Sequence, residues 1–141
     1  MKSKVEVEIN KPLPEVADLF FNPANNPKWM EDLERYEPVS GEQGRLGSAY
    51  RLIPKKGNMI FLATVVAQSA DEVKLNFEAS NVRVLIKGKL VALPAARTKL
   101  ISEEEFIFKG LFNSLFGFLV QKSIKAVHRH HIQNFKRFAE K

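Results

Sequence analysis

The sequence predicts an α+β fold, in which a strongly curved antiparallel sheet of seven strands surrounds a long C-terminal helix. Two short helices are expected after the first strand. Three features of the sequence predict this fold: an alternating N-terminal stretch, a central series of short apolar runs separated by turn residues, and an amphipathic, proline-free segment at the end. The length of 141 residues suits one core. We find no repeat, low-complexity tract or long linker, so we expect a single domain over residues 1–141.

The N-terminal region is expected to form one strand and two short helices. Apolar and charged residues alternate over 4–9, which is the period of a half-buried strand. Pro14 can occupy the first turn of a helix, where its missing N–H group costs nothing, and Asn22-Pro23 ends that helix. A second helical turn is plausible around residues 27–33, again opened by a proline.

The central region predicts six further strands. Runs containing Gly, Pro, Asn, Asp and Ser separate them, and connections this short favour antiparallel hairpins. In residues 72–79 apolar and polar side chains alternate, so one face of the sheet is apolar and must be covered by another element. The expected strands cover 35–39, 48–53, 59–68, 72–79, 82–93 and 98–109.

The cover is the C-terminal segment, residues 111–139, which contains no proline. At a rise of about 1.5 Å per residue, a helix of this length would run on the order of 40 Å, which is the width of a sheet. Its predicted apolar stripe consists of Phe116, Val120, Ile124, Val127, Phe135 and Phe138.

Composition excludes several classes of protein. The chain has no cysteine, which rules out disulfides, thiolate nucleophiles and Cys-based metal sites. The most apolar run, residues 106–120, is interrupted by polar residues and is too short to span a bilayer. There is no signal-peptide core at the N-terminus. We therefore expect a soluble, cytoplasmic protein, either a monomer or a homodimer.

The net charge of +6 lies entirely on the C-terminal segment. From Lys109 onward there are seven basic residues and one acidic residue (7 − 1 = +6), while the first 108 residues have 15 of each sign. We interpret the charge as the solvated face of a helix. The alternative is peripheral contact with an anionic membrane. Nucleic acid is a less suitable partner, because no base-stacking motif accompanies the charge.

Three stretches resemble one known family. They are INKPLPEVADLFFNPANNPKW (9–29), the glycine-rich hairpin SGEQGRLGSAYRL (40–52), and the closing segment from GLFNSLFGFLV to FKRFAEK (110–141). Together with the order of elements, they make the chain similar to the START-like, or Bet v 1-like, helix-grip superfamily (SRPBCC), including its polyketide cyclase/dehydrase and lipid-transport branch. The resemblance covers essentially the whole chain. The fold hosts carriers, enzymes and regulators alike.

The resemblance implies an apolar cavity between the sheet and the helix, with Trp29 near its rim. The alternative for Trp29, the only tryptophan, is a purely structural role in the core. The eleven phenylalanines could likewise line a pocket or simply pack the core. The expected ligand-binding residues are Trp29, Tyr50, Phe61, Phe77, Phe106, Phe116, Val120, Ile124, Val127 and His131.

His131 lies in the middle of the apolar stripe, whereas His128 and His130 are expected at its margins. Such a histidine is usually a hydrogen-bonded core residue; alternatively it is a polar anchor or a general acid or base in the pocket. His128 and His131 have the spacing i, i+3, but no third ligand is apparent, so we expect no metal site.

The SEEEF stretch, residues 102–106, leaves the facing of its acidic residues open. If Leu100 and Phe106 point inward, Ser102 and Glu104 do too, and Glu104 could meet His131 as an acid–base couple. The opposite phase, or a β-bulge, would turn Glu103 and Glu105 inward instead.

The sequence therefore predicts a protein that binds, and possibly transports, a small hydrophobic ligand such as a lipid or polyketide, without a cofactor. No nucleotide-binding, nucleophile-elbow or zinc motif is present. The alternative is an enzyme of the cyclase or dehydratase kind that uses His131 and Glu104 on a bound hydrophobic substrate.

Overall fold

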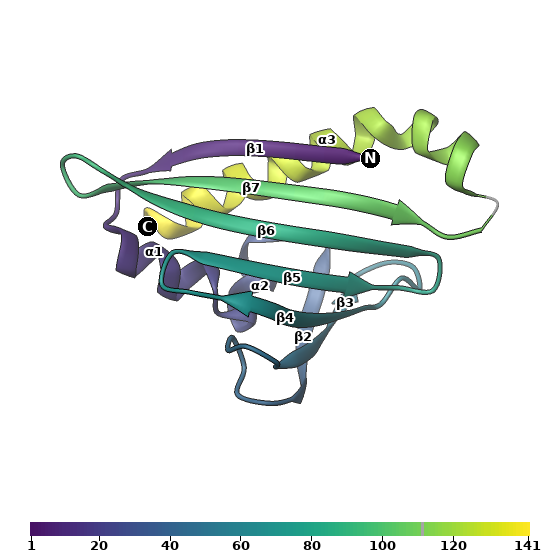
Figure 1. Cartoon of the computed structure of the whole chain (residues 1–141), viewed down its shortest axis with the longest axis horizontal. Helices are drawn as coiled ribbons and strands as arrows, with labels where there is room; N and C mark the ends of the chain where they lie inside the picture. The colour runs from purple at the N-terminus through teal and green to yellow at the C-terminus, as the bar shows by residue number, and fades with distance from the viewer. Residues whose placement is uncertain (111) are drawn as a thin grey trace.

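The computed structural model describes residues 1–110 and 112–141, and the side chains of 1–110 and 121–141. It confirms the α+β prediction (Figure 1). The strands are β1 (Lys2–Ile9), β2 (Leu33–Ser40), β3 (Ala49–Pro54), β4 (Phe61–Gln68), β5 (Glu72–Glu78), β6 (Val82–Leu93) and β7 (Arg97–Phe108). The helices are α1 (Leu13–Phe20), the 3₁₀ helix η1 (Pro23–Asn25), α2 (Asn26–Trp29) and α3 (Phe112–Ala139).

The seven strands form one antiparallel sheet in the order β1-β7-β6-β5-β4-β3-β2. The hairpins follow the chain from β2 to β7, and β1 then pairs with β7. Register shifts occur between β2 and β3 and between β4 and β5, where bulges bend and twist a sheet. The pairing of β7 with both neighbours has no such shift, so its side chains alternate without interruption.

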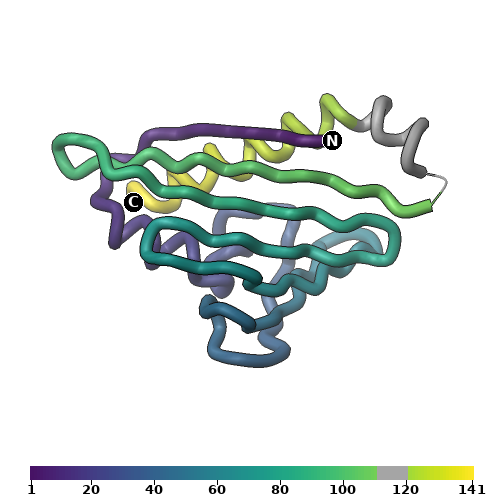
Figure 2. Tube along the Cα trace, in the orientation of Figure 1, coloured from purple at the N-terminus to yellow at the C-terminus, as the bar shows by residue number. Residues whose placement is uncertain are grey.

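The long helix α3 runs along the concave face of the sheet, beside β1 and β7 (Figure 1). Figure 2 shows the C-terminal end of the chain beside the segment that contains α1, while β2 and β3 lie farther from α3. The helices α1 and α2 contact α3 and connect β1 to the far edge of the sheet. One end of the space between the sheet and the helix is therefore covered by short helices. No helix in the described residues is long and apolar enough to cross a membrane.

The connection after α1 contains the predicted second helical turn, but it begins and ends earlier than residues 27–33. Asn22-Pro23 ends α1, and the chain continues at once as η1 and then α2, which ends at Trp29. The side chain of Asn22 accepts a hydrogen bond from the N–H group of Ala24, and Asn25 donates one to the carbonyl oxygen of Leu19. These polar side chains satisfy backbone groups at the helix ends, so the Asn-Pro-rich stretch forms a compact corner.

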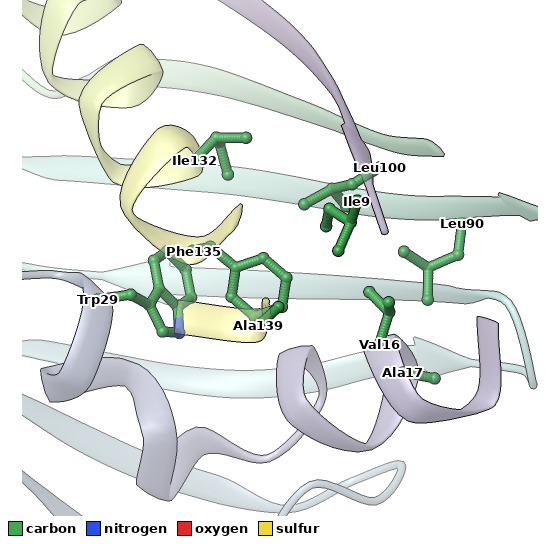
Figure 3. Packing of buried hydrophobic residues seen from close by; sticks show 9 residues of the cluster. All are labelled: Ile9, Val16, Ala17, Trp29, Leu90, Leu100, Ile132, Phe135 and Ala139. Atoms are coloured by element: carbon green, nitrogen blue, oxygen red, sulfur yellow. The ribbon is translucent and has the colours of Figure 1, made fainter. Parts of the chain in front are cut away.

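The buried apolar residues form two clusters. The first, which we call the closed-end core, lies where α1, α2 and the end of α3 meet the sheet (Figure 3). The second, the sheet core, covers the inner face of β2 to β6. The closed-end core consists of Ile9, Val16, Ala17, Trp29, Leu90, Leu100, Ile132, Phe135 and Ala139. The sheet core consists of Leu33, Tyr50, Leu52, Ala63, Phe77, Val82 and Val84.

Candidate ligand-binding cleft

An open cleft of about 610 Å³ lies between α3 and the inner face of the sheet. The sheet side is built by β2 to β7, because the alternation of each strand directs one set of apolar side chains toward the helix. Lys55 and Lys56, in the β3–β4 connection, also line the cleft. Its apolar lining consists mainly of Met30, Leu33, Leu52, Phe61, Phe77, Val84, Ile86, Phe106, Ile124 and Val127.

A smaller cavity of about 50 Å³ lies deeper, beside the closed-end core. Phe20, Trp29 and Tyr50 contribute to its wall. Five residues line both the cavity and the cleft, and we call this shared boundary the neck. The residues of the neck are Met30, Phe77, Ile86, Glu104 and His131.

Trp29 both packs in the core and lines a cavity, the two roles that the sequence left open for it. Its side chain is 8% exposed, and its ring stacks on Phe20 with centroids 5.8 Å apart and meets Phe135 edge to face at 5.3 Å. It therefore packs in the closed-end core, as Figure 3 shows, rather than in an open loop at a rim. It also lines the inner cavity. Trp29 thus separates the cavity from the solid end of the molecule.

The register of β7 places Glu104 inside. Glu104 lies opposite Ser3 on β1 and Ile86 on β6, in the same phase as the buried Leu100 and Ser102. Its side chain is 18% exposed, and burial raises the pKa of its carboxyl group to about 7. Near neutral pH this group can therefore hold or release a proton at the neck.

His128 lies behind Glu104 and is almost completely buried, at 1% exposure. Its Nδ1 atom is 2.8 Å from Ser3 Oγ, and its Nε2 atom is 2.9 Å from Ser102 Oγ. Burial lowers the pKa of His128 to about 4, so its imidazole is neutral at pH 7. A neutral imidazole donates from one nitrogen and accepts at the other, and the two serine hydroxyls can serve both roles.

His131 is bonded to Asp32 and not to Glu104. His131 Nε2 donates a hydrogen bond to Asp32 Oδ1 at 2.8 Å, and this bond lowers the pKa of Asp32. Among the described residues, the basic group within 4 Å of the Glu104 carboxyl is His128, with 3.7 Å between Nε2 and Oε2. His131 and Glu104 both belong to the neck, but the predicted acid–base couple is not a hydrogen-bonded pair.

One expectation for the helix face was wrong. His128 was expected at the margin of the apolar stripe and is buried, because Ser3 and Ser102 satisfy both of its nitrogens. Val127, expected among the ligand-binding residues, lines the open cleft and is 50% exposed. The side chains of Phe116 and Val120 lie outside the described residues.

The other expected ligand-binding residues surround the two spaces. Phe61, Phe106 and Ile124 line the cleft, Tyr50 lines the inner cavity, and Phe77 lines both. Burial raises the pKa of the Tyr50 hydroxyl, which therefore remains protonated. Sequence reasoning did not identify Met30, Asp32, Ile86, Ser3 or His128 as part of this region.

One signal in the sequence could have settled the facing of Glu104. Lys4 lies opposite Glu103, and Lys2 lies opposite Glu105, so the outward acidic residues meet basic ones across the ladder. Glu104 instead lies opposite Ser3. Matching the KSK stretch of β1 to the EEE stretch of β7 would have assigned the middle glutamate to the interior.

Within the side chains that the structure describes, no group of three or more His, Asp or Glu residues is arranged to hold a metal ion.

Comparison with solved structures finds the same architecture over nearly the whole chain. A START superfamily protein from Mycobacterium smegmatis has a TM-score of 0.82 at 14% identity, with 99% of this chain and 97% of that chain covered. A truncated norcoclaurine synthase from Thalictrum flavum has a TM-score of 0.73 at 12% identity, covering 98% and 92%. The Zhui aromatase/cyclase from Streptomyces sp. R1128 has a TM-score of 0.72 at 14% identity, covering 98% and 95%.

The chain has the START-like helix-grip fold. This confirms the fold that the sequence resemblance implied. No protein-family model matches the sequence, and neither does a curated protein. Because the structural neighbours of this helix-grip protein share so few residues with it, the likeness establishes the fold, and its function has to be argued from the cleft.

Proposed function

We propose that this chain is a single ligand-binding domain that holds a small hydrophobic molecule, such as a lipid or polyketide, in the cleft and the inner cavity. The observation that carries the proposal is the presence of two adjoining, mostly apolar spaces that share the neck. Pockets of several hundred Å³ with apolar walls and a few polar groups are typical of small-molecule sites. Removing apolar ligand surface from water would provide about 25 cal/mol per Å².

Native mass spectrometry of the freshly purified protein tests this directly. We expect a bound apolar compound, released on mild activation, in place of the mass of the bare chain alone. A second test is titration with a neutral environment-sensitive dye such as N-phenyl-1-naphthylamine.

A matched pair of variants locates the dye. Ile86 lies in the neck, whereas the neighbouring Leu85 faces outward and is 40% exposed. We expect Ile86→Phe to fill the space and reduce the dye signal, and Leu85→Phe to leave it unchanged. Equal signals from the two variants would place the dye elsewhere and contradict the proposal.

A catalytic function is a second candidate, favoured by the carboxyl group of Glu104 at the boundary of the two spaces. A cavity-facing acid that titrates near neutral pH suits general acid–base catalysis. Two of the structural neighbours are named as a synthase and an aromatase/cyclase. For any hydrophobic substrate that the protein converts, Glu104→Gln should abolish the pH dependence of the rate near pH 7. An unchanged profile would exclude Glu104 from the chemistry.

The location of the protein follows from the same proposal. A carrier without cysteine suits the reducing cytoplasm. The basic α3 would then make peripheral contact with an anionic membrane at which the ligand is collected or delivered.

A further inference from the structure

We propose that the neck is a subsite for a protonated amine, so that the ligand is a hydrophobic molecule with one ammonium group paired to Glu104. This inference rests on the proposed function and specifies the chemical class of the ligand. It follows from three features of the neck. The carboxyl group of Glu104 has no hydrogen-bond donor among the described residues, the imidazole of His128 behind it is already hydrogen-bonded to two serines, and apolar residues surround the carboxyl group.

The carboxyl group of Glu104 is the first feature. Among the described residues nothing donates a hydrogen bond to it, and no lysine or arginine lies within ion-pair distance of it. Its side chain is mostly buried and lines both the inner cavity and the cleft. A carboxylate withdrawn from water is costly unless a donor or cation compensates it, so this group favours a ligand that supplies one.

The described side chains around Glu104 do not supply that partner. His128 is the nearest ionisable group at 3.7 Å, but both of its nitrogens are engaged by Ser3 and Ser102. His131, also in the neck, directs its Nε2 atom to Asp32. The polar side of the neck therefore presents an acceptor with no proton donor directed at it.

The sign of the charge distinguishes an amine from other head groups. A carboxylate or phosphate group at the neck would meet the negative charge of Glu104, while Lys55 and Lys56 line the cleft but not the inner cavity and so lie outside the neck. A hydroxyl group could donate one hydrogen bond but would leave the charge uncompensated. An ammonium group donates up to three hydrogen bonds and pairs with the charge.

Apolar residues define where the remainder of the ligand lies. Phe77, Ile86 and Met30 surround the carboxyl group in the neck, with the apolar cleft on one side and the small cavity on the other. The cavity of about 50 Å³ has room for little more than a small group, whereas the cleft of about 610 Å³ can take the body of the ligand. The ammonium group would therefore lie at the inner end of the ligand.

Pairing of Glu104 with an ammonium group predicts that ligand binding depends on pH. When Glu104 is protonated in the free protein, binding of an ammonium ion releases that proton to solvent, so affinity for the amine should fall as the pH drops below about 7. The ladder neighbours Ser3 and Ile86 do not titrate. The other ionisable groups that line the cleft are Asp32, Lys55, Lys56, His128 and His131.

The test uses three ligands with the same tail: decylamine, decanol and decanoate. Their affinities are measured by displacement of the bound dye at pH 8, for the wild type, Glu104→Gln and the control Glu103→Gln. Glu103 is the adjacent, outward-facing glutamate, opposite Lys4 and Lys87. In the wild type and the control, decylamine should bind about tenfold or more tightly than decanol, the usual gain for a charge-assisted bond. In Glu104→Gln that preference should disappear.

Each other outcome overturns the inference. If decylamine and decanol bind equally to the wild type, or if Glu104→Gln keeps the preference, the neck is not an amine subsite. If decanoate binds best, the head group lies at Lys55 and Lys56 instead. In these cases the proposed function survives, because a hydrophobic ligand still binds; if none of the three ligands binds, the proposed function fails as well. The pH dependence of the wild type gives a second test that needs no variant.

Discussion

Glu104 and His128 lie 3.7 Å apart in the interior, and burial shifts their pKa values in opposite directions. The pKa of Glu104 rises from 4.5 to about 7, and that of His128 falls from 6.5 to about 4. Both shifts favour the neutral form, so between about pH 4 and pH 7 the folded protein keeps two uncharged groups where an ion pair could form. Their effects on stability have opposite signs.

Replacing Glu104 with glutamine should stabilise the protein at alkaline pH. A carboxyl group whose pKa is raised by folding stabilises the fold below pH 4.5 and loses that contribution as the pH rises through about 7. The neutral amide does not titrate, so we expect Glu104→Gln to be more stable than the wild type at pH 8 by roughly 1–3 kcal/mol. The advantage should vanish near pH 4.5. Urea unfolding at the two pH values measures it, with Glu103→Gln as the control that shows no such change.

The same variant should reveal the contribution of His128. A histidine whose pKa is lowered by folding stabilises the fold above pH 6.5 and destabilises it as the pH falls toward 4. In the wild type, Glu104 opposes this effect over much of that range. Without Glu104, the stability should therefore fall more steeply between pH 6.5 and 4 than in the wild type. Parallel stability curves for the two proteins would contradict the assigned shifts.

The residues of the site were predictable only where one element determines them. The inward aromatic side chains follow from strand alternation, so Phe61, Phe77 and Phe106 could be identified in advance. His128 could not, because its burial depends on hydroxyl groups from β1 and β7, which lie far from it in the chain. The pairing of His131 with Asp32 likewise joins residues 99 positions apart.

At the scale of the elements, α1 packs so closely against β6 that a side chain at Gly88 would displace a neighbouring ring. A Cβ atom added at Gly88 would lie 2.5 Å from Cε2 of Phe20. We expect Gly88→Ala to destabilise the protein by about 1–3 kcal/mol, the usual cost of overpacking. Urea unfolding measures the loss.

The compensating variant is Phe20→Leu, which removes the clashing ring. The double variant Gly88→Ala/Phe20→Leu should lose less stability than the sum of the single changes, because the new methyl group occupies space left by the ring. If the two losses simply add, the contact between Phe20 and Gly88 does not limit position 88.

The β6–β7 turn holds two alanines in a conformation that suits glycine. Ala95 and Ala96 have φ angles of 63° and 55°, which L-residues with a Cβ atom rarely adopt. Ala96→Gly should therefore stabilise the protein by up to about 1 kcal/mol, as relief of strain outweighs the added backbone entropy. The matched control is Ala92→Gly in the exposed part of β6, which should be destabilising. A loss of melting temperature in both variants would show that the turn is not strained.

The elements themselves were predictable because their signals are local. Alternation and the turn residues between short apolar runs predicted the seven strands, and the proline-free amphipathic segment predicted α3. The corner between α1 and β2 was less predictable, because its regular form depends on side-chain hydrogen bonds of Asn22 and Asn25 to backbone groups. The prolines and asparagines that end α1 also form the N-terminal caps and first turns of the short helices that follow it.

For the whole molecule, the fold was easier to predict than the cleft. The fold follows from the order of the elements and from the need to cover the apolar face of the sheet. The volume of the cleft is the space left when side chains from six strands and one helix fail to meet, so it depends on every long-range contact at once. Val127 illustrates this: the apolar stripe placed it on the inner face of α3, but only the long-range packing determines that it lines open space and is half exposed.

The net positive charge of the chain lies on its C-terminal segment. Lys122, Lys125 and Arg129 are exposed on α3. On an anionic membrane surface each such residue contributes about 1 kcal/mol at most, so together they could hold the protein there reversibly. We expect binding to vesicles of phosphatidylserine and phosphatidylcholine that weakens as salt is added, since screening shortens the range of the attraction.

Matched variants separate the charge of the helix from the charge of the whole protein. The triple change Lys122→Gln, Lys125→Gln and Arg129→Gln should weaken vesicle binding by about tenfold or more in sedimentation assays. The control replaces three lysines of β5 and β6 (Lys74, Lys87 and Lys89) with glutamine, which removes the same charge from the sheet. It should reduce binding far less, because a surface that docks through α3 brings the helix, and not the sheet, within a Debye length of the lipid head groups. Equal losses in the two variants would mean that net charge alone drives binding, and binding that salt does not change would remove the membrane from the proposed function.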